Sequence, residues 1–308
     1  MSQIQSAVQY LETLCQEGKL NHGDYEFSPA FPLSKLTTFR TGGNAAVLFL
    51  ETDAPIQPLI GFLKREKIPY YILGNGSNVL AKDEGYDGLV ISLARLQNVS
   101  FSGTRVTAAC GVPITRLARL CRDKGLTGME FFYGIPGTCG GAVFMNAGAY
   151  GGECCDILES VTFLDDNGDL QTLPPSDLAF SHRTSLFQKK GGVILSAVFS
   201  LKLGNISEIT ETMEDLMRRR VEKQPLEYPS AGSTFRRCEG RYTAQMIDNA
   251  GLKGYAIGGA MVSPKHAGFI INYDNATSTD ILRLIKHVQD VLWEKEGVRI
   301  ECEVRILE

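Results

Sequence analysis

The sequence lacks the features that mark membrane, secreted and nucleic-acid-binding proteins. No uninterrupted apolar run reaches the roughly 18 residues that a membrane helix needs, and the first residues carry no secretory-signal pattern. The densest basic run, at 217–220, lies in a helical pattern and fits a solvated helix face. We therefore expect a cytoplasmic protein that contacts neither membrane nor nucleic acid, and the simplest expectation is a monomer.

The spacings typical of metal sites are also missing. The four histidines are scattered, and none of the eight cysteines is spaced as C-x-x-C. A zinc site would need clustered ligands. In a reducing compartment we expect the cysteines to be free thiols, several of them buried, and we expect no metal site.

The chain has 308 residues, 44% of them hydrophobic, which is enough for two or three domains. Apolar periodicity predicts helices at 3–16, 54–66 (capped by Asp53), 113–124, 206–223 and 279–296. Strands are predicted at 46–50, 70–73, 89–93, 106–110, 161–164, 193–201 and 299–307. Because the two element types do not alternate steadily, we predict an α+β fold with several small sheets. Composition shifts suggest boundaries near residue 100 and at 224–230.

Three glycine-containing segments could hold phosphates. At 71–80 a predicted strand enters a loop with two glycines, Ser77 and Asn78, which fits an anion nest or a plain turn. Val79 stands where the third glycine of a Rossmann fingerprint would be, so that motif is weak. At 36–45 the chain combines a cation, hydroxyls and a Gly-Gly bend, which fits a pyrophosphate contact or a loop entering a strand.

The third segment is the densest in glycine, with seven in the 19 residues from 134 to 152. No ordinary helix or strand is expected there. A flexible linker would lack the apolar residues Ile135, Val143, Phe144 and Met145. We therefore favour a loop that lines a cofactor.

Three polar segments could carry chemistry. Residues 181–185 place an arginine among hydroxyls, and 231–235 place a serine directly after a glycine. Residues 300–306 alternate strictly, so Ile300 and Ile306 should share one face while Glu303 lies on the other. On the pattern alone, Glu303 is either a solvated strand residue or a catalytic acid.

In this order, these segments resemble the UDP-N-acetylenolpyruvoylglucosamine reductases over residues 32–307. The resemblance implies a vanillyl-alcohol-oxidase (PCMH-type) FAD-binding fold of two α+β subdomains, here 1–100 with 300–308 and 101–225. An α+β substrate-binding domain would follow at 226–299. The residues implied to line a non-covalent FAD are Arg40, Gly42, Gly43, Gly74, Asn75, Gly76, Ser77, Asn78, Pro136, Gly137, Thr138, Gly140, Gly141, Asn146, Ala147, Gly148 and Ala149.

The family's catalytic residues fall on Arg183, Ser233 and Glu303. The resemblance implies that Ser233 donates a proton, that Arg183 stabilises negative charge and that Glu303 acts as a protonated carboxyl donor. Lys223 would bind the substrate phosphate, and Arg237 and His266 would lie near the sugar nucleotide.

The implied reaction is NADPH-dependent reduction of UDP-N-acetylglucosamine enolpyruvate to UDP-N-acetylmuramate for peptidoglycan synthesis. The connection between Phe187 and Val193 is too short for the insertion of one family branch, so the chain resembles the shorter, type II branch. It departs from the family at Cys238, where a proline is usual. A flavin oxidase of the same fold would not need Ser233 and Glu303 together, and a non-enzymatic nucleotide-binding regulator would need none of the three catalytic residues.

Overall fold

A computed structural model describes residues 3–238 and 240–308. The predictions that touch Met1, Ser2 and Glu239 therefore lie outside the described residues. The chain forms two compact units, each built from segments that are separate in sequence. The first unit comprises 1–29, 46–75 and 88–218, and the second comprises 30–45, 76–87 and 219–308. The predicted division into three domains stays a prediction.

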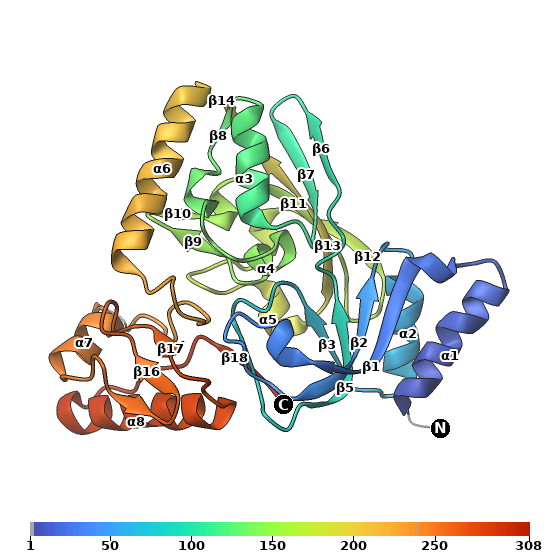
Figure 1. The fold of residues 1–308 in the computed structure, drawn as a ribbon. Coiled ribbons are helices and arrows are strands. Elements are labelled where there is room, and N and C mark those ends of the chain that lie inside the picture. Colours follow the sequence, from blue (N-terminus) through green and yellow to red (C-terminus); the bar gives the residue numbers. More distant parts are fainter. Residues whose placement is uncertain (1–2, 239) are drawn as a thin grey trace. The chain divides into compact units, whose positions relative to one another are not determined.

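The first unit contains two sheets. One has the strand order β1 (Tyr25–Pro32), β2 (Asn44–Leu50), β5 (Tyr86–Ser92) and β3 (Tyr70–Leu73). Helix α1 (Gln3–Gln16) packs on α2 (Ile56–Arg65), and the rings of Tyr10 and Phe62 stack at 4.4 Å. Figure 1 shows both helices beside this sheet.

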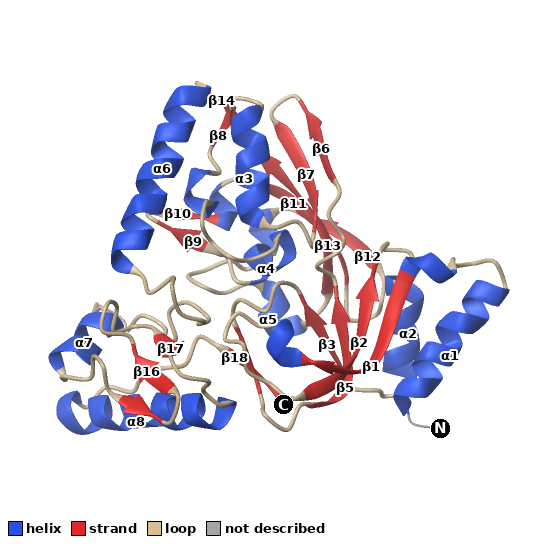
Figure 2. Cartoon of the chain, in the orientation of Figure 1, coloured by secondary structure: helices blue, strands red, loops and turns tan. Residues whose placement is uncertain are grey.

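The second sheet of this unit is antiparallel throughout. Its order is β12 (Leu170–Leu173), β11 (Leu158–Leu164), β13 (Val193–Ser200), β7 (Arg105–Ala109) and β6 (Val99–Ser102). Two short pairs accompany it, β9 (Gly148–Ala149) with β10 (Gly152–Glu153) and β8 (Leu126–Thr127) with β14 (Lys202–Leu203). The helices in this region are α3 (Ile114–Asp123), α4 (Cys139–Phe144), α5 (Leu186–Lys190) and the long α6 (Ile206–Lys223). Figure 2 separates helices from strands by colour.

The second unit has its own core. Helix α8 (Ser278–Glu296) packs on the small sheet of β15 (Ala256–Ile257), β16 (Ala260–Val262) and β17 (Ile270–Asn272). Helix α7 (Thr243–Asn249) contacts α8. The last strand, β18 (Arg305–Leu307), pairs in parallel with β4 (Val79–Ala81). The mixed set of small sheets confirms the predicted α+β class.

Helical periodicity identified the buried faces well in three helices. All the apolar positions predicted to face inward are buried in α2, α3 and α8. In α1 the spacing places Ile4, Val8, Leu11 and Cys15 on the inner face, but the buried residues are Ala7, Leu11 and Leu14. In α6, Ile209 and Met213 are buried as predicted, whereas Ile206, the first residue of the helix, is exposed.

Two other local predictions are wrong. Asp53 does not cap α2 with its side chain; Pro55 occupies the N-cap position, and only the Asp53 carbonyl accepts a bond, from Ile56. The strand predicted at 299–307 is reduced to Arg305–Leu307, and Ile306 is exposed. The alternation holds up to Val304, since Ile300 and Val304 are buried, and it breaks at Ile306. Before Arg305 the chain makes only an isolated bridge, between Cys302 and Phe235.

The cysteines confirm the expectation of buried thiols. All eight are free, and Cys110, Cys121, Cys139 and Cys154 are buried. Burial raises the pKa of both Cys110 and Cys121 to about 12, so these thiols stay protonated and unreactive at neutral pH. Within the described residues there is no cluster of three or more candidate metal ligands, and no helix is long and apolar enough to cross a bilayer.

The first backbone amides of helix α8 bind an aspartate from a loop that is distant in the sequence. The Asp83 carboxylate accepts hydrogen bonds from the amides of Ser278 at 2.8 Å and Thr279 at 3.1 Å. The Asp83 amide in turn donates to the Ser278 hydroxyl. Burial raises the pKa of Asp83, but the bonds from Ser278 and Thr279 outweigh burial and lower it overall.

We expect Asp83→Asn to lower the free energy of unfolding by about 1 kcal/mol near neutral pH, because it removes the charge at a helix N-terminus. A carboxylate with a lowered folded pKa contributes stability above its unfolded pKa of about 3.9 and loses it as the pH falls through the folded value. The difference between wild type and variant should therefore shrink on acidification below about pH 4. Urea unfolding across pH measures this, with Asp87→Asn on β5 as the exposed control. A difference that is independent of pH would contradict the role of the charge.

Candidate functional site

A helix lies inside the glycine-rich segment, where none was expected. Helix α4 spans Cys139–Phe144, and the Thr138 hydroxyl caps it by accepting from the Gly141 amide at 3.3 Å. A Cβ at Gly140 would lie 2.9 Å from the Cys110 Cβ, so this glycine permits close packing on the neighbouring strand segment. The low helix propensity of glycine is outweighed here by a cap and by tertiary contact.

The first unit brings two of the predicted cofactor segments together. The Asn75 side chain donates to the Pro136 carbonyl at 2.5 Å. A Cβ at Gly74 would lie 2.5 Å from the Thr138 hydroxyl. The Gly137 carbonyl accepts from Ile114 at 3.0 Å, which ties the glycine-rich segment to the start of α3.

The second unit brings the third segment, at 36–45, against the part of the 71–80 segment that follows Asn75. The Thr38 amide donates to the Gly76 carbonyl at 3.2 Å. A Cβ at Gly76 would lie 2.0 Å from the Leu36 carbonyl oxygen, and one at Gly43 would lie 2.2 Å from that of Asp83. These glycines are therefore required by the chain's own backbone packing, whatever else they contact.

The remaining predicted cofactor residues surround these contacts. Arg40 is exposed and Ser77 half-buried, and a Cβ at Gly42 would lie 2.5 Å from that of Ala81. The Asn78 side chain donates to the Glu303 carbonyl at 3.1 Å. In the first unit, the Ala147 carbonyl accepts a hydrogen bond from the Cys154 amide, and Gly148–Ala149 forms β9, which pairs with β10.

The loop at 37–43 has unused hydrogen-bonding capacity in two of the hydroxyls that the sequence pattern at 36–45 indicated, although neither residue is among those named for the cofactor. The hydroxyls of Thr38 and Thr41 are buried, and no described residue accepts or donates a bond to either. Leaving a buried hydroxyl unpaired costs about 1–3 kcal/mol. Phosphate oxygens are suitable acceptors for such groups, so this donor set fits a dinucleotide cofactor. The sequence signal was the density of threonine around Arg40.

The three predicted catalytic residues divide between the units. Arg183 belongs to the first unit, where it is half-buried and its guanidinium donates to the Gly148 carbonyl at 2.8 Å. Ser233 and Glu303 belong to the second unit. There, the Glu303 amide donates to the Thr234 carbonyl at 2.8 Å, which places Glu303 beside the residue that follows Ser233.

Buried hydrogen bonds of Thr234 hold the contact between this residue and Glu303 in place. It is fully buried; its amide donates to the Gly268 carbonyl at 2.8 Å, and its hydroxyl accepts from the Ile270 amide at 3.1 Å. The structure therefore brings Ser233, exposed at the surface, next to Glu303 although 70 residues separate them in sequence. Asn78 contacts the same Glu303 carbonyl, so a predicted cofactor turn meets the predicted catalytic pair in this unit.

Of the predicted substrate residues, His266 contacts Gly268, which binds Thr234, and Lys223 lies at the end of a helix. The ring of His266 accepts from the Gly268 amide at 3.1 Å, and burial lowers the pKa of His266, so it is neutral at pH 7. Lys223 is exposed and is the last residue of α6. The neighbouring turn of α6 is held by Lys265, whose ammonium donates to the Val221 carbonyl at 2.6 Å.

Arg237, the third, is exposed and lies over the Tyr242 ring, 5.2 Å from its centroid. Next to it, the Cys238 amide donates to the Thr243 hydroxyl at 3.2 Å. A proline at 238 could not make this bond because it has no N–H. The departure at Cys238 therefore adds a contact that the usual residue would lack.

Two family models match the chain. Residues 224–307 match the C-terminal domain of UDP-N-acetylenolpyruvoylglucosamine reductase, and residues 44–174 match the FAD binding domain. The reductase of Caldanaerobacter subterraneus subsp. tengcongensis is 46% identical over 302 residues, covering 97% of both chains. That of Limosilactobacillus fermentum is 46% identical over 277 residues, covering 90% of this chain and 92% of the relative.

The chain belongs to the UDP-N-acetylenolpyruvoylglucosamine reductases. The crystal structure of the reductase (MurB) from Thermus caldophilus agrees, with a TM-score of 0.80 and 32% identity over 92% of this chain and all of that one. As a member of this reductase family with an FAD-binding domain, the chain is an FAD-dependent oxidoreductase with the predicted FAD-binding fold and a C-terminal domain.

We expect Gly76→Ala to destabilise the reductase even without FAD. The new Cβ would collide with the Leu36 carbonyl, and φ at Gly76 is +59°. Overpacking and the left-handed backbone together should cost roughly 2–5 kcal/mol. Gly103→Ala is the matched control, because φ is +58° and a Cβ there would meet nothing within 4 Å. Urea unfolding of the flavin-free forms compares them. Equal losses in the two variants would mean that Gly76 is not needed for backbone packing.

Proposed function

We propose that this chain reduces UDP-N-acetylglucosamine enolpyruvate to UDP-N-acetylmuramate with NADPH, in the synthesis of peptidoglycan precursors. The observation that carries the proposal is the hydrogen bond from the Glu303 amide to the Thr234 carbonyl, which brings Glu303 beside the residue that follows Ser233 in a chain of this reductase family. The relatives' names supply the substrate class.

When bound, FAD would supply the redox chemistry, which is the transfer of hydride from NADPH to the methylene carbon of the enol ether. In this proposal the cofactor is held by the backbone of 134–149 and 74–78 and by the loop at 37–43. The buried hydroxyls of Thr38 and Thr41 are the donors that support phosphate binding there.

Arg183 and Glu303 stabilise the charge that the reaction creates. Hydride addition to the methylene carbon leaves negative charge on the adjacent carbon and its carboxylate. A fixed guanidinium aimed at that charge contributes on the order of a few kcal/mol to transition-state stabilisation. The Glu303 carboxyl group, in its protonated form, donates a hydrogen bond to the same carboxylate.

Ser233 then protonates the adjacent carbon to complete the lactyl ether. A serine hydroxyl is a weak acid, and it can serve because the carbanion-like centre is a strong base. The buried bonds of Thr234 hold the backbone next to Ser233 in place, so the hydroxyl needs little reorganisation when the charge appears.

We expect Ser233→Ala to keep flavin reduction by NADPH and to slow flavin reoxidation by the enolpyruvyl substrate by about 10²–10⁴-fold, the usual loss for a missing proton donor. Anaerobic stopped-flow absorbance measures both half-reactions separately. Wild type should bleach with one equivalent of NADPH and regain its oxidised band on addition of substrate.

The matched control is Ser100→Ala, an exposed serine on β6. If both half-reactions fell equally in Ser233→Ala, the proton-donor role would be wrong. If wild-type flavin bleached but did not return with this substrate, the acceptor would be a different molecule.

Lys223→Ala should raise the substrate KM more than it lowers kcat. An exposed ammonium that holds a phosphate binds the ground state and the transition state equally. Its loss therefore weakens substrate binding and leaves the chemical step unchanged. Steady-state kinetics at varied substrate tests this, with Lys202→Ala on β14 as an exposed control. A fall in kcat at unchanged KM would place Lys223 in the chemical step instead.

A further inference from the structure

The side-chain amide of Asn146 is engaged entirely within the protein. Asn146 is 1% exposed. Its Nδ2 donates to the Glu153 carboxylate at 2.8 Å and to the Ser181 carbonyl at 3.1 Å. Its Oδ1 accepts from the Cys155 amide at 3.0 Å. Both N–H donors of the Asn146 side chain are therefore used within the protein.

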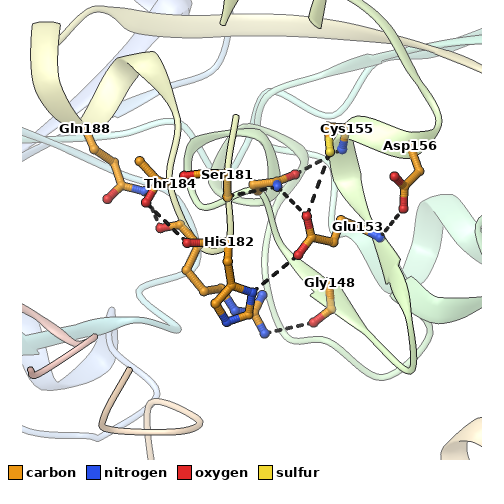
Figure 3. Close-up of polar contacts among 10 residues, drawn as sticks. Gly148, Glu153, Cys155, Asp156, Ser181, His182, Thr184 and Gln188 are labelled. Atoms are coloured by element: carbon orange, nitrogen blue, oxygen red, sulfur yellow. Dashed lines mark hydrogen bonds and ion pairs between the residues drawn. The ribbon is translucent and has the colours of Figure 1, made fainter. Parts of the chain in front are cut away.

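These bonds reach the segment that carries Arg183. Ser181 and Thr184 exchange backbone hydrogen bonds at 3.1 and 3.0 Å, which closes a tight turn around His182 and Arg183. Figure 3 shows His182 directed toward Glu153 on the adjacent hairpin, while Thr184 lies on the other side of the turn, beside Gln188. His182 Nδ1 lies 3.4 Å from the Glu153 carboxylate. Asn146 thus holds the start of the turn, and Glu153 contacts its middle.

The turn needs this support because Arg183 has an unfavourable backbone. Its φ is +54°, in the left-handed region that costs roughly 1–2 kcal/mol for a residue with a side chain. Such conformations persist where the surroundings over-determine them. A second set of bonds does so from the other side: Gln188 Nε2 donates to the carbonyls of Arg183 and Phe144, both at 2.9 Å.

The same hairpin receives the Arg183 side chain. Glu153 of β10 pairs with Gly148 of β9, whose carbonyl accepts from the Arg183 guanidinium at 2.8 Å. Asn146 therefore connects three things: the hairpin through Glu153, the turn through Ser181 and the chain after the hairpin through Cys155. A shift of the turn relative to the hairpin would move the guanidinium.

We propose that Asn146, with Glu153 as its acceptor, is a positioning residue that fixes the backbone and guanidinium of Arg183 for the substrate half-reaction. The inference rests on the proposed role of Arg183 in stabilising the substrate carboxylate. It assigns to the Asn146 side chain a task distinct from lining the cofactor.

The test is Asn146→Asp. Aspartate has the same shape, tolerates the left-handed φ of +43° and keeps the oxygen that accepts from Cys155. It loses both donors and places a second carboxylate against Glu153. We expect flavin reoxidation by substrate to slow by on the order of 10- to 100-fold, while reduction by NADPH and FAD content stay as in wild type.

A reversed pair separates positioning from general damage. In Asn146→Asp/Glu153→Gln, the glutamine can donate to the aspartate, so the link between hairpin and residue 146 is restored with donor and acceptor exchanged. Part of the reoxidation rate should return. Glu153→Gln alone keeps an acceptor for Asn146 and should have the smaller effect. Asn275→Asp, at an exposed asparagine with φ of +48°, is the matched control for the isosteric change.

Hydrogen exchange of the peptide covering 178–190 gives a readout that is independent of activity. Asn146→Asp should speed exchange of the Ser181 and Thr184 amides, because the Ser181 carbonyl loses its donor. Wild-type exchange in Asn146→Asp, or an equal fall of both half-reactions with loss of FAD, would overturn the proposal.

Arg183→Ala separates this proposal from the function on which it rests. If Arg183→Ala slows reoxidation and Asn146→Asp does not, only the positioning role fails. If Arg183→Ala leaves reoxidation unchanged, the catalytic assignment of Arg183 fails and the positioning role fails with it.

Discussion

The C-terminal end of helix α4 is the point on which the predicted catalytic arginine depends. The carbonyl of Phe144 accepts from both Ser185 and Gln188, and two residues later the side chain of Asn146 donates to the Ser181 carbonyl. A six-residue helix is too short to be stable by itself. It forms because Thr138 caps it and because Gly140 packs closely on Cys110. Burial then makes its polar end a fixed anchor for the turn that carries Arg183.

The second unit holds its own predicted catalytic residues mainly with backbone groups. Thr234 is buried; its hydroxyl accepts from the Ile270 amide, and its carbonyl accepts from the Glu303 amide. Gly76 and Gly43 let loops approach carbonyl oxygens more closely than any side chain would permit. The glycines that looked like a cofactor signature are thus also a requirement of chain packing, and the two demands act on the same positions. In the loop at 37–43, the buried hydroxyls of Thr38 and Thr41 have no hydrogen-bond partner among the described residues.

Much of the architecture could be predicted because it is encoded locally. The buried faces of α2, α3 and α8 follow from apolar residues three and four positions apart, which must share one side of a helix. The family motifs identified the candidate residues for the same reason, since each motif is a short run of chain. The strand at 299–307 failed because alternation indicates a face to bury, and only Arg305–Leu307 finds a partner strand.

The sequence by itself determined the α+β class, the family and the residue types available for catalysis. Tertiary structure alone decided that a helix forms in the glycine-rich segment, that Glu303 lies beside Thr234, and that Asn146 binds Glu153 and Ser181. The physical reason is that these contacts join residues far apart in the chain, where hydrogen-bond geometry and burial depend on how the backbone closes. From the sequence, an asparagine in a glycine-rich run is a candidate ligand contact. Only the structure shows that the donors of Asn146 are already used within the protein.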